Sequence, residues 1–417
     1  MHPKTRIPIR LRQAVLAITV AGMNAGTYAQ STKPPASLKD LFDAAWAQQP
    51  ESQALLARRD AVQAQRRAAA AWAPEAPALE VTHKTDRLNR NNGAREFEVG
   101  IAIPLWLPGE QRGSSALADA EAAALASRVE AARLRLAATV REAWWNWQLA
   151  HTGAEMARAQ LDNARRIAAD VARRAKAGDL ARADQHQADG AVAAAEASVA
   201  QSGAGATTAL QQLKALTGGV ALPTLADTSS AEPEPAPEDT SAHPALSELQ
   251  DRATVAERTA ALAARQSRAN PELMLSTTRD RGALGERYDQ TITLGIRIPL
   301  GASPRHDSRV AAARADAVEA QAQLALDRAR LQSEREAAAV RVDAARAQLA
   351  ATERRSTLAR ETRGFFDKSF RLGETDLPTR LRIEAEATEA ERQAARSRIE
   401  LAAAISAWRQ ALGLLPQ

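Results

Sequence analysis

The sequence predicts a mainly α-helical protein with a small β part. Three observations carry this prediction: an internal duplication, two proline-free stretches of 68 residues, and short segments in which every second residue is apolar. Alanine, arginine, glutamate and glutamine dominate the composition, and only 3% of the residues are aromatic. Such a composition is typical of long helices that pack closely on one another rather than of a globular core.

The N-terminus has the organisation of a signal peptide. Residues 14–26 form an apolar run that is too short to span a bilayer as a helix. Small residues follow up to Ala29, so we expect a signal peptide at 1–29 with cleavage after Ala29. A buried N-terminal helix is the alternative. The basic residues ahead of the apolar run are Lys4, Arg6, Arg10 and Arg12.

Net charge and cysteine content exclude several classes of protein. The formal charge of the chain is +5, and the four positive charges of the predicted signal peptide leave 5 − 4 = +1. We therefore expect no nucleic-acid partner. The chain has no cysteine, which excludes a disulfide, a thiolate metal site and a cysteine-linked lipid anchor.

The chain is a tandem repeat. Val99–Leu105 recurs 195 residues later as Leu294–Leu300, and the same offset relates Gly178 to Gly373. One offset that holds over distant landmarks indicates two copies of one structural unit.

The two repeats are expected at 38–219 and 243–415. The proline-rich linker between them, 220–242, cannot bury enough apolar surface to fold alone. Each repeat is predicted to contain a helix, a β-hairpin, a long helix, a tip turn and a return helix. In the first repeat these are Leu38–Ala73, 77–105, 110–177, the turn near Gly178 and the helix after it; in the second they are Pro244–Arg268, 271–300, 305–372, the turn near Gly373 and the helix after it.

The second strand of each hairpin alternates strictly. Apolar residues occupy every second position, as in a strand with one apolar face. Two hairpins supply four strands, too few for a membrane barrel, which needs about eight or more. Either the strands pack in a soluble sheet or several chains pool them, and alternation alone fits both. The apolar positions include Val99, Ile101, Ile103, Leu294, Ile296 and Ile298.

The two long helices are predicted to extend far beyond a globular domain. A helix of 68 residues would be about 100 Å long at roughly 1.5 Å per residue. In the second helix Leu331, Ala338 and Ala345 recur every seven residues. This is a coiled-coil seam whose small residues let a neighbouring helix approach closely.

The order of these parts resembles the TolC-type outer-membrane factors. The resemblance rests on the signal peptide, the duplicated unit, a strand that ends in Gly-Ile-x-Ile-Pro-Leu, the long helix, and Arg-Leu-Gly-Glu-Thr-Asp-Leu at 371–377. It covers nearly all of the chain after the signal peptide, although no single motif is specific.

The resemblance implies a homotrimer in the bacterial outer membrane. Twelve strands would form a barrel in the outer-membrane lipid, and the helices would continue it as a tube through the periplasm. The six apolar strand positions named above would then face lipid. The resemblance further implies a passive efflux duct that depends on a periplasmic adaptor and on an inner-membrane pump of the resistance-nodulation-division type.

The same resemblance places the adaptor contact at the two tips. The first tip departs from the family pattern, because Leu180 comes early and residues 181–184 replace the apolar tail. Each tip glycine can also be interpreted simply as the residue that ends a helix. The docking residues carried over are Gly178, Leu180, Arg371, Gly373, Leu377 and Leu381.

Acidic residues follow both tips. In a threefold channel, any one that faces the pore would form a ring of three carboxylates, a common device for selecting cations. The alternative is a solvated outer face of the helix. The candidates are Asp184, Asp189, Glu384 and Glu386.

Trp106–Arg112 resembles the heavy-metal branch of the family, the outer component of cobalt–zinc–cadmium efflux. The histidines are scattered without ligand spacing, so the sequence predicts no metal site and no cofactor. Drug efflux and type I protein secretion are the alternative roles.

Other classes fit less well. No nucleophile–histidine–acid set and no phosphate-binding loop indicates an enzyme, so we expect no catalytic residues. A periplasmic adaptor would carry many more strands, and a filamentous coiled-coil protein would lack the hairpins and the glycine turns.

Overall fold

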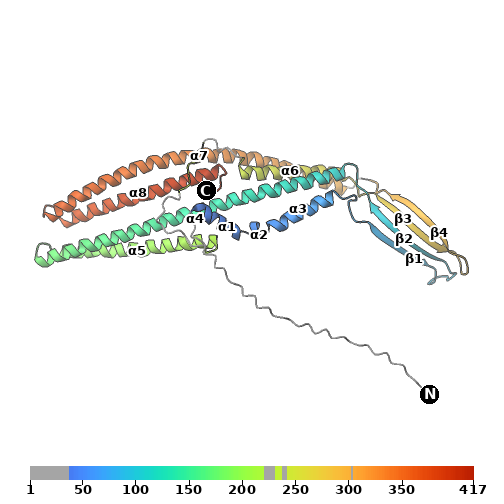
Figure 1. Ribbon diagram of the computed structural model, residues 1–417, viewed down its shortest axis with the longest axis horizontal. Coiled ribbons are helices and arrows are strands. Elements are labelled where there is room, and N and C mark those ends of the chain that lie inside the picture. Colours follow the sequence, from blue (N-terminus) through green and yellow to red (C-terminus); the bar gives the residue numbers. More distant parts are fainter. Residues whose placement is uncertain (1–36, 220–230, 237–241, 302–303) are drawn as a thin grey trace, which may run out of the picture. The chain divides into compact units, whose positions relative to one another are not determined.

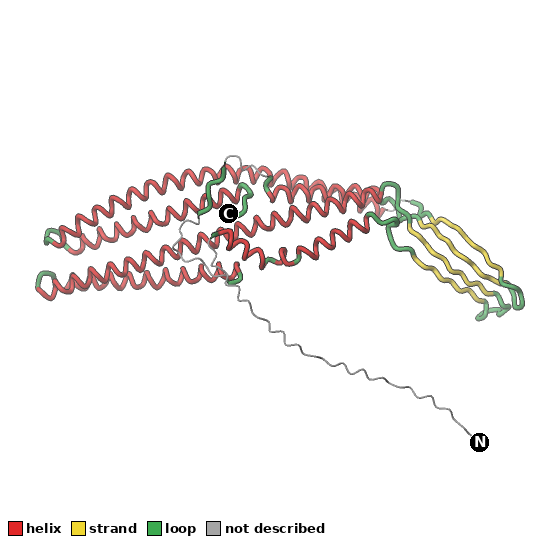
Figure 2. Tube along the Cα trace, in the orientation of Figure 1, coloured by secondary structure: helices red, strands yellow, loops and turns green. Residues whose placement is uncertain are grey.

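Helices make up most of the computed structural model, with one antiparallel sheet (Figures 1 and 2). The structure describes residues 37–219, 231–236, 242–301 and 304–417. Two units are distinguished, Met1–Lys33 and Pro34–Gln417. The predicted signal peptide and most of the predicted linker lie outside the described residues. The prediction of a mainly helical fold with a small β part is confirmed.

Two long helices organise the second unit. The helices α4 and α7 have 68 residues each, or about 100 Å at 1.5 Å per residue. Each turns back at a glycine into a return helix that packs along it (Figure 1). The bounds are Glu110–Ala177 for α4, Arg182–Thr217 for α5, Pro304–Arg371 for α7 and Leu377–Ala411 for α8.

The helix predicted at Leu38–Ala73 is wrong as a single element. The chain is extended at Gln49, with ψ of 137°, because a residue before proline is disfavoured in the helical conformation. Pro50 then begins a new helix. The observed helices are α1 Leu38–Gln48, α2 Pro50–Gln53 and α3 Leu55–Ala69; in the second repeat one helix, α6 Pro244–Arg265, precedes the strands.

The four strands form one sheet in the order β1-β2-β3-β4, so β2 of the first repeat pairs with β3 of the second. Within the described chain β1 and β4 are the open edges of this sheet. The predicted strand through Ile298 and Leu300 stops earlier, at Arg297, because its partner strand begins just after Pro271 and offers no further pairing. The bounds are β1 Ala78–Thr85, β2 Arg95–Pro104, β3 Glu272–Arg281 and β4 Asp289–Arg297.

The register puts the apolar residues of all four strands on one face. Leu79 lies opposite Ile101, Ile101 opposite Leu275, and Leu275 opposite Leu294. These side chains are exposed, whereas Gly100, on the other face, is buried. The apolar face is therefore the more exposed of the two, although burial normally covers apolar surface.

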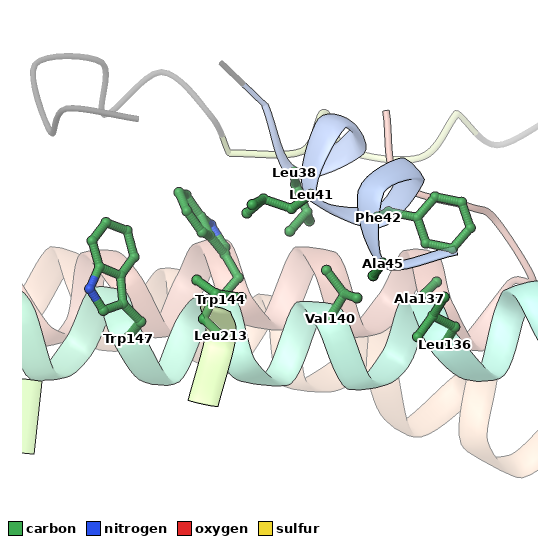
Figure 3. Close-up of a cluster of buried hydrophobic side chains, with 10 residues drawn as sticks. All are labelled: Leu38, Leu41, Phe42, Ala45, Leu136, Ala137, Val140, Trp144, Trp147 and Leu213. Atoms are coloured by element: carbon green, nitrogen blue, oxygen red, sulfur yellow. The ribbon is translucent and has the colours of Figure 1, made fainter. Parts of the chain in front are cut away.

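The main hydrophobic core lies where the short helix α1 packs against the middle of α4 (Figure 3). Ser37 caps α1, and its hydroxyl accepts a hydrogen bond from the Asp40 N–H. The indole rings of Trp144 and Trp147 lie beside each other, with centroids 5.1 Å apart. The core residues are Leu38, Leu41, Phe42, Ala45, Leu136, Ala137, Val140, Trp144, Trp147 and Leu213.

The two faces of α7 differ in how far their apolar side chains are buried. Ala338 and Val342 of the predicted seam are buried. A second apolar stripe at helical spacing runs along the other side of the helix and is exposed in the chain. It comprises Val318, Leu326, Val340, Leu358 and Phe365. Among the described residues, no helix is long and apolar enough to cross a membrane.

Candidate docking site at the two helical tips

Both tips use the same backbone device. Gly178 and Gly373 have φ of 90° and 79°, the left-handed conformation that disfavours other residues. At each tip the glycine N–H and the next N–H bond back to carbonyls of the long helix, which satisfies groups left open at the helix end. Asp376 then caps α8, its carboxylate accepting a hydrogen bond from the Thr379 N–H at 3.1 Å.

The two tips share one small core. Phe370 of α7 is buried between two guanidinium groups, with Arg174 of α4 at 5.0 Å and Arg380 of α8 at 4.6 Å from the ring centroid. Such cation–π stacking joins the first repeat to the second. The other buried members of this core are Ile167, Val171, Ala188 and Leu377.

This core contains or contacts three of the predicted docking residues. Leu377 is only 1% exposed, so it packs inside the chain and is not offered to a partner. Leu180 and Leu381 are partly buried against the same core. In contrast, Leu372 is 74% exposed at the end of α7, beside the exposed Arg371. Sequence reasoning missed Leu372, although it stands between the two predicted contacts Arg371 and Gly373.

Arg371 is held in place by charge. It pairs with Asp367 one turn earlier, and the same carboxylate accepts a hydrogen bond from Arg380 at 2.7 Å. The second tip therefore presents an apolar and a cationic side chain, Leu372 and Arg371, on a turn that is fixed on both sides. The first tip exposes the cation Lys176, but its other exposed residues, Ala177, Gly178 and Asp179, offer no large apolar side chain.

The four predicted pore acids differ in their surroundings. Asp184 accepts a hydrogen bond from the Ala181 N–H at 3.0 Å and so helps to start α5. Glu386 pairs with Arg382 on an exposed helix face. Glu384 lines a cavity of about 660 Å³ between α4, α7 and α8, where Arg363 bridges it to Glu391. Asp189 is exposed. Among these four, Glu384 has the most enclosed position.

A buried ion cluster outside the tips was not predicted. Glu232, in the part of the linker that the structure describes, has a fully buried carboxylate. Arg141 of α4 donates two hydrogen bonds to it, at 2.6 and 2.8 Å, and Nε of Arg409 in α8 lies 3.3 Å away. The linker thus connects the long helix of one repeat to the return helix of the other. An arginine amid the apolar Ala137, Val140 and Trp144 is the signal that could have indicated it.

The segment that resembles the heavy-metal branch has a structural role. The Glu110 carboxylate is buried and accepts hydrogen bonds from Leu107 N–H, Gln266 and Asn270 at 3.0, 2.8 and 2.8 Å. It ties the start of α4 to the segment that leads into β3. Within the residues that the structure describes, no group of three or more His, Asp or Glu side chains could hold a metal ion.

Several solved structures share this fold. The chain is similar to CusC, whose structures describe transmembrane channel formation, with a TM-score of 0.74, 17% identity, and coverage of 92% of this chain and 96% of that one. It is also similar to VceC from Vibrio cholerae, with a TM-score of 0.69, 19% identity, and coverage of 90% of this chain and 96% of that one. The open state of the MtrE channel of Neisseria gonorrhoeae gives a TM-score of 0.71, 16% identity, and coverage of 90% and 89%. At these identities the likeness establishes the fold.

A family model matches part of the sequence. Residues 41–219, which fall within the first repeat, match the model of the outer membrane efflux protein family. No curated protein matches the sequence.

Proposed function

We propose that three copies of this chain form a passive outer-membrane efflux channel, exported by the signal at 1–29. The sheet is the observation that carries the proposal. Its two edge strands, β1 and β4, are open in the described chain, and its apolar face is exposed. An open sheet edge is not tolerated in lipid, so the strands need copies of the chain to close the sheet. Three chains supply twelve strands, enough for a closed barrel with the apolar face outward.

The exposed stripe of α7 supports the same assembly. It holds large apolar side chains such as Val340 and Phe365 that nothing in the described chain covers. An apolar stripe on a long helix is typically covered by another helix. We assign a helix of a neighbouring copy to this stripe, so that the helices also close into a tube.

The tips are the proposed contact for a periplasmic adaptor, which would couple the channel to an inner-membrane pump of the resistance-nodulation-division type. Arg371, Leu372 and Gly373 form the contact surface of the second tip, with Gly178 at the first. Leu180, Leu377 and Leu381 support the shape of the tips from inside. The contact therefore depends on a few exposed residues and on the core beneath them.

Disulfide cross-linking tests the trimer. The natural chain has no cysteine, so every disulfide in a double variant must join the introduced residues, and the single variants show any bond between two copies of the same residue. Val81→Cys on β1 would be combined in turn with Ile292→Cys, Leu294→Cys or Ile296→Cys on β4. Within one chain these strands are separated by β2 and β3, or about 14 Å at roughly 4.8 Å per strand, too far for a disulfide.

We expect at least one of these pairs to give cross-linked dimers and trimers in the outer-membrane fraction. The matched control is Ile101→Cys with Leu275→Cys, which lie opposite each other within the chain and should give monomers only. Monomers from every β1–β4 pair, with the protein in the soluble fraction, would refute the proposed assembly.

Metal cations are the first cargo to test. On the face of the sheet opposite the apolar one, Glu96, Asp280 and Asp289 lie side by side across β2, β3 and β4. In a trimer this row would face the pore three times, and carboxylate rings favour cations. Resistance to cobalt, zinc and cadmium would be compared with resistance to drugs in a strain that lacks the channel. Restored drug resistance without restored metal resistance would favour the drug-efflux alternative.

A further inference from the structure

The end of the sheet farthest from the helices carries arginines on its apolar face. Arg281 lies opposite Arg95, and Arg279 lies opposite Phe97. Phe97 belongs to the same face as Ile101, because alternate residues of a strand point to the same side. The guanidinium groups of Arg95, Arg279 and Arg281 therefore lie at the far end of the apolar face.

An aromatic ring joins two of these arginines. The guanidinium groups of Arg279 and Arg281 lie 5.3 and 5.0 Å from the centroid of Tyr288, just before β4. Nε of Arg281 also donates a hydrogen bond to the Gly93 carbonyl at 3.1 Å. The ring and the loop thus hold two cations next to each other at one corner of the face. Tyrosine is enriched where apolar surface meets water at a membrane boundary.

Acidic residues at the same end of the sheet lie on its opposite face. Glu96, Asp280 and Asp289 alternate in sequence with the arginines and occupy the opposite face of the sheet. Among the described residues, no carboxylate lies within 4.0 Å of the guanidinium groups of Arg95, Arg279 or Arg281. On the acidic face Lys84 pairs with Glu96 at 2.7 Å, whereas the three arginines lie on the other face without a carboxylate in the described chain.

The cation cluster is unfavourable by itself. Arg95 and Arg281 are directly opposite each other in an antiparallel pair, and like charges at such positions destabilise a sheet. An anion shared between them would remove that cost. A ligand that touches these arginines and the adjoining Phe97 and Ile101 needs an anionic head and apolar chains.

We propose that Arg95, Arg279 and Arg281, with Tyr288, bind the phosphate groups of a phosphorylated lipid in the outer leaflet of the membrane. This inference rests on the proposed function, which places the turns at 86–94 and 282–288 outside the cell. Guanidinium groups bind phosphate through paired, charge-assisted hydrogen bonds. The acyl chains of the lipid would lie on the apolar face below.

Lipid A is the probe that tests this site. Delipidated trimer in mild detergent would be titrated with lipid A, with chemically dephosphorylated lipid A, and with inorganic phosphate at the same concentration, and the shift in melting temperature would be recorded. We expect lipid A to stabilise the trimer, dephosphorylated lipid A to do so much less, and inorganic phosphate to have no effect, because it lacks the acyl chains.

Two variants probe the arginines. Among the described residues the side chain of Arg279 makes no hydrogen bond, so Arg279→Gln loses only its contact with Tyr288. Combined with Arg281→Gln, it removes both guanidinium groups from the ring. The affinity for lipid A should fall about tenfold for each guanidinium removed. The matched control, Asp280→Asn with Asp289→Asn, changes two charges at the same level on the opposite face and should leave lipid binding unchanged.

The outcomes separate this inference from the proposed function. If the wild-type trimer forms in the outer membrane but binds both forms of lipid A equally, or if the arginine variants bind like the wild type, the lipid site is refuted and the channel stands. If no trimer forms, the proposed function fails and the lipid site fails with it.

Discussion

The two repeats have the same order of elements but bury different surfaces. In the first repeat α4 lies between α3, α5, α6 and α8 and carries the main core. In the second, α7 contacts α6 and α8 and leaves an apolar stripe exposed. At the repeat offset of 195 residues, Trp144 and Trp147 correspond to Ala339 and Val342. Duplication copied the backbone, and the side chains then diverged with the neighbours of each helix.

The two repeats are joined by shared clusters to which each contributes different residues. Only the first repeat has α1, which covers the tryptophans, and only the linker carries the buried Glu232. The second repeat contributes Arg409 to that cluster and Phe370 to the tip core. The first repeat therefore carries the larger buried core, and the second repeat leaves an apolar stripe of α7 exposed.

The largest expected change in stability comes from removing the Glu232 carboxylate, which contacts arginines of both repeats. Glu232→Ala leaves the buried Arg141 and Arg409 without their carboxylate, although hydrogen bonds from Arg141 to Gln410 and from Arg409 to the Pro233 carbonyl remain. The loss of the carboxylate should lower the free energy of unfolding by about 3–5 kcal/mol. The measurement is denaturant unfolding in detergent, followed by helical circular dichroism. The control is Glu234→Ala, which removes an exposed pair with Arg346 and should cost about 0–1 kcal/mol. Equal losses from the two variants would show that burial of the cluster contributes nothing.

The strands should respond alike in both repeats, because the register places both on one face. Ile101→Arg and Ile296→Arg should each cost about 2–4 kcal/mol near the middle of the bilayer and reduce the amount of trimer in the outer membrane. Ala102→Ser, on the opposite face, should insert normally. Normal insertion of Ile101→Arg together with failure of Ala102→Ser would mean that the faces are reversed.

Substitutions at the two tips should differ in their effect on efflux. Gly373→Pro and Leu372→Asp should leave the amount of trimer unchanged, because the second tip is about 100 Å from the strands at the spacing of a helix. Resistance of the complemented strain should fall to the level of the strain without the channel. Gly178→Pro should have a milder effect, since the first tip offers no exposed leucine. Full resistance from both second-tip variants, at normal trimer level, would leave Gly373 with a capping role only.

The smallest expected effect concerns the residue before the proline of each repeat. His243 caps α6, its Nδ1 accepting from the Ala245 N–H at 3.3 Å, whereas Gln49 makes no side-chain cap. Burial, and then the charge of Arg335, lower the pKa of His243 below its usual value of 6.5. The folded state therefore favours the neutral ring. Its contribution to stability is complete above pH 6.5 and is lost as the pH falls from 6.5 toward the lowered pKa.

His243→Asn keeps a cap acceptor and removes the titration. The melting temperature of the wild type should fall more steeply than that of the variant between about pH 7.5 and about pH 5.5. Parallel curves would show that His243 does not contribute to the pH dependence.

Local patterns were sufficient for much of the fold. Proline-free stretches and glycines with a common offset indicated α4, α7 and their turns, because a helix of this length needs no tertiary contact to define its period or its end. Alternation indicated β2 and β4 for a similar reason. The prediction of one helix at Leu38–Ala73 was wrong, because the residue before Pro50 is extended and divides the segment.

By itself the sequence determined the duplicated order, the long helices, the alternating strands and the resemblance to outer-membrane factors. Only the tertiary structure decided which residues are buried and which are exposed. Leu377 and Leu372 are both leucines beside Gly373, and one is buried under Phe370 while the other is exposed. Glu232 likewise appears as one acid of a proline-rich segment until Arg141 and Arg409, far apart in the chain, meet around it. Periodicity is a property of neighbours in sequence, whereas burial and ion pairing depend on helices that approach each other from separate repeats.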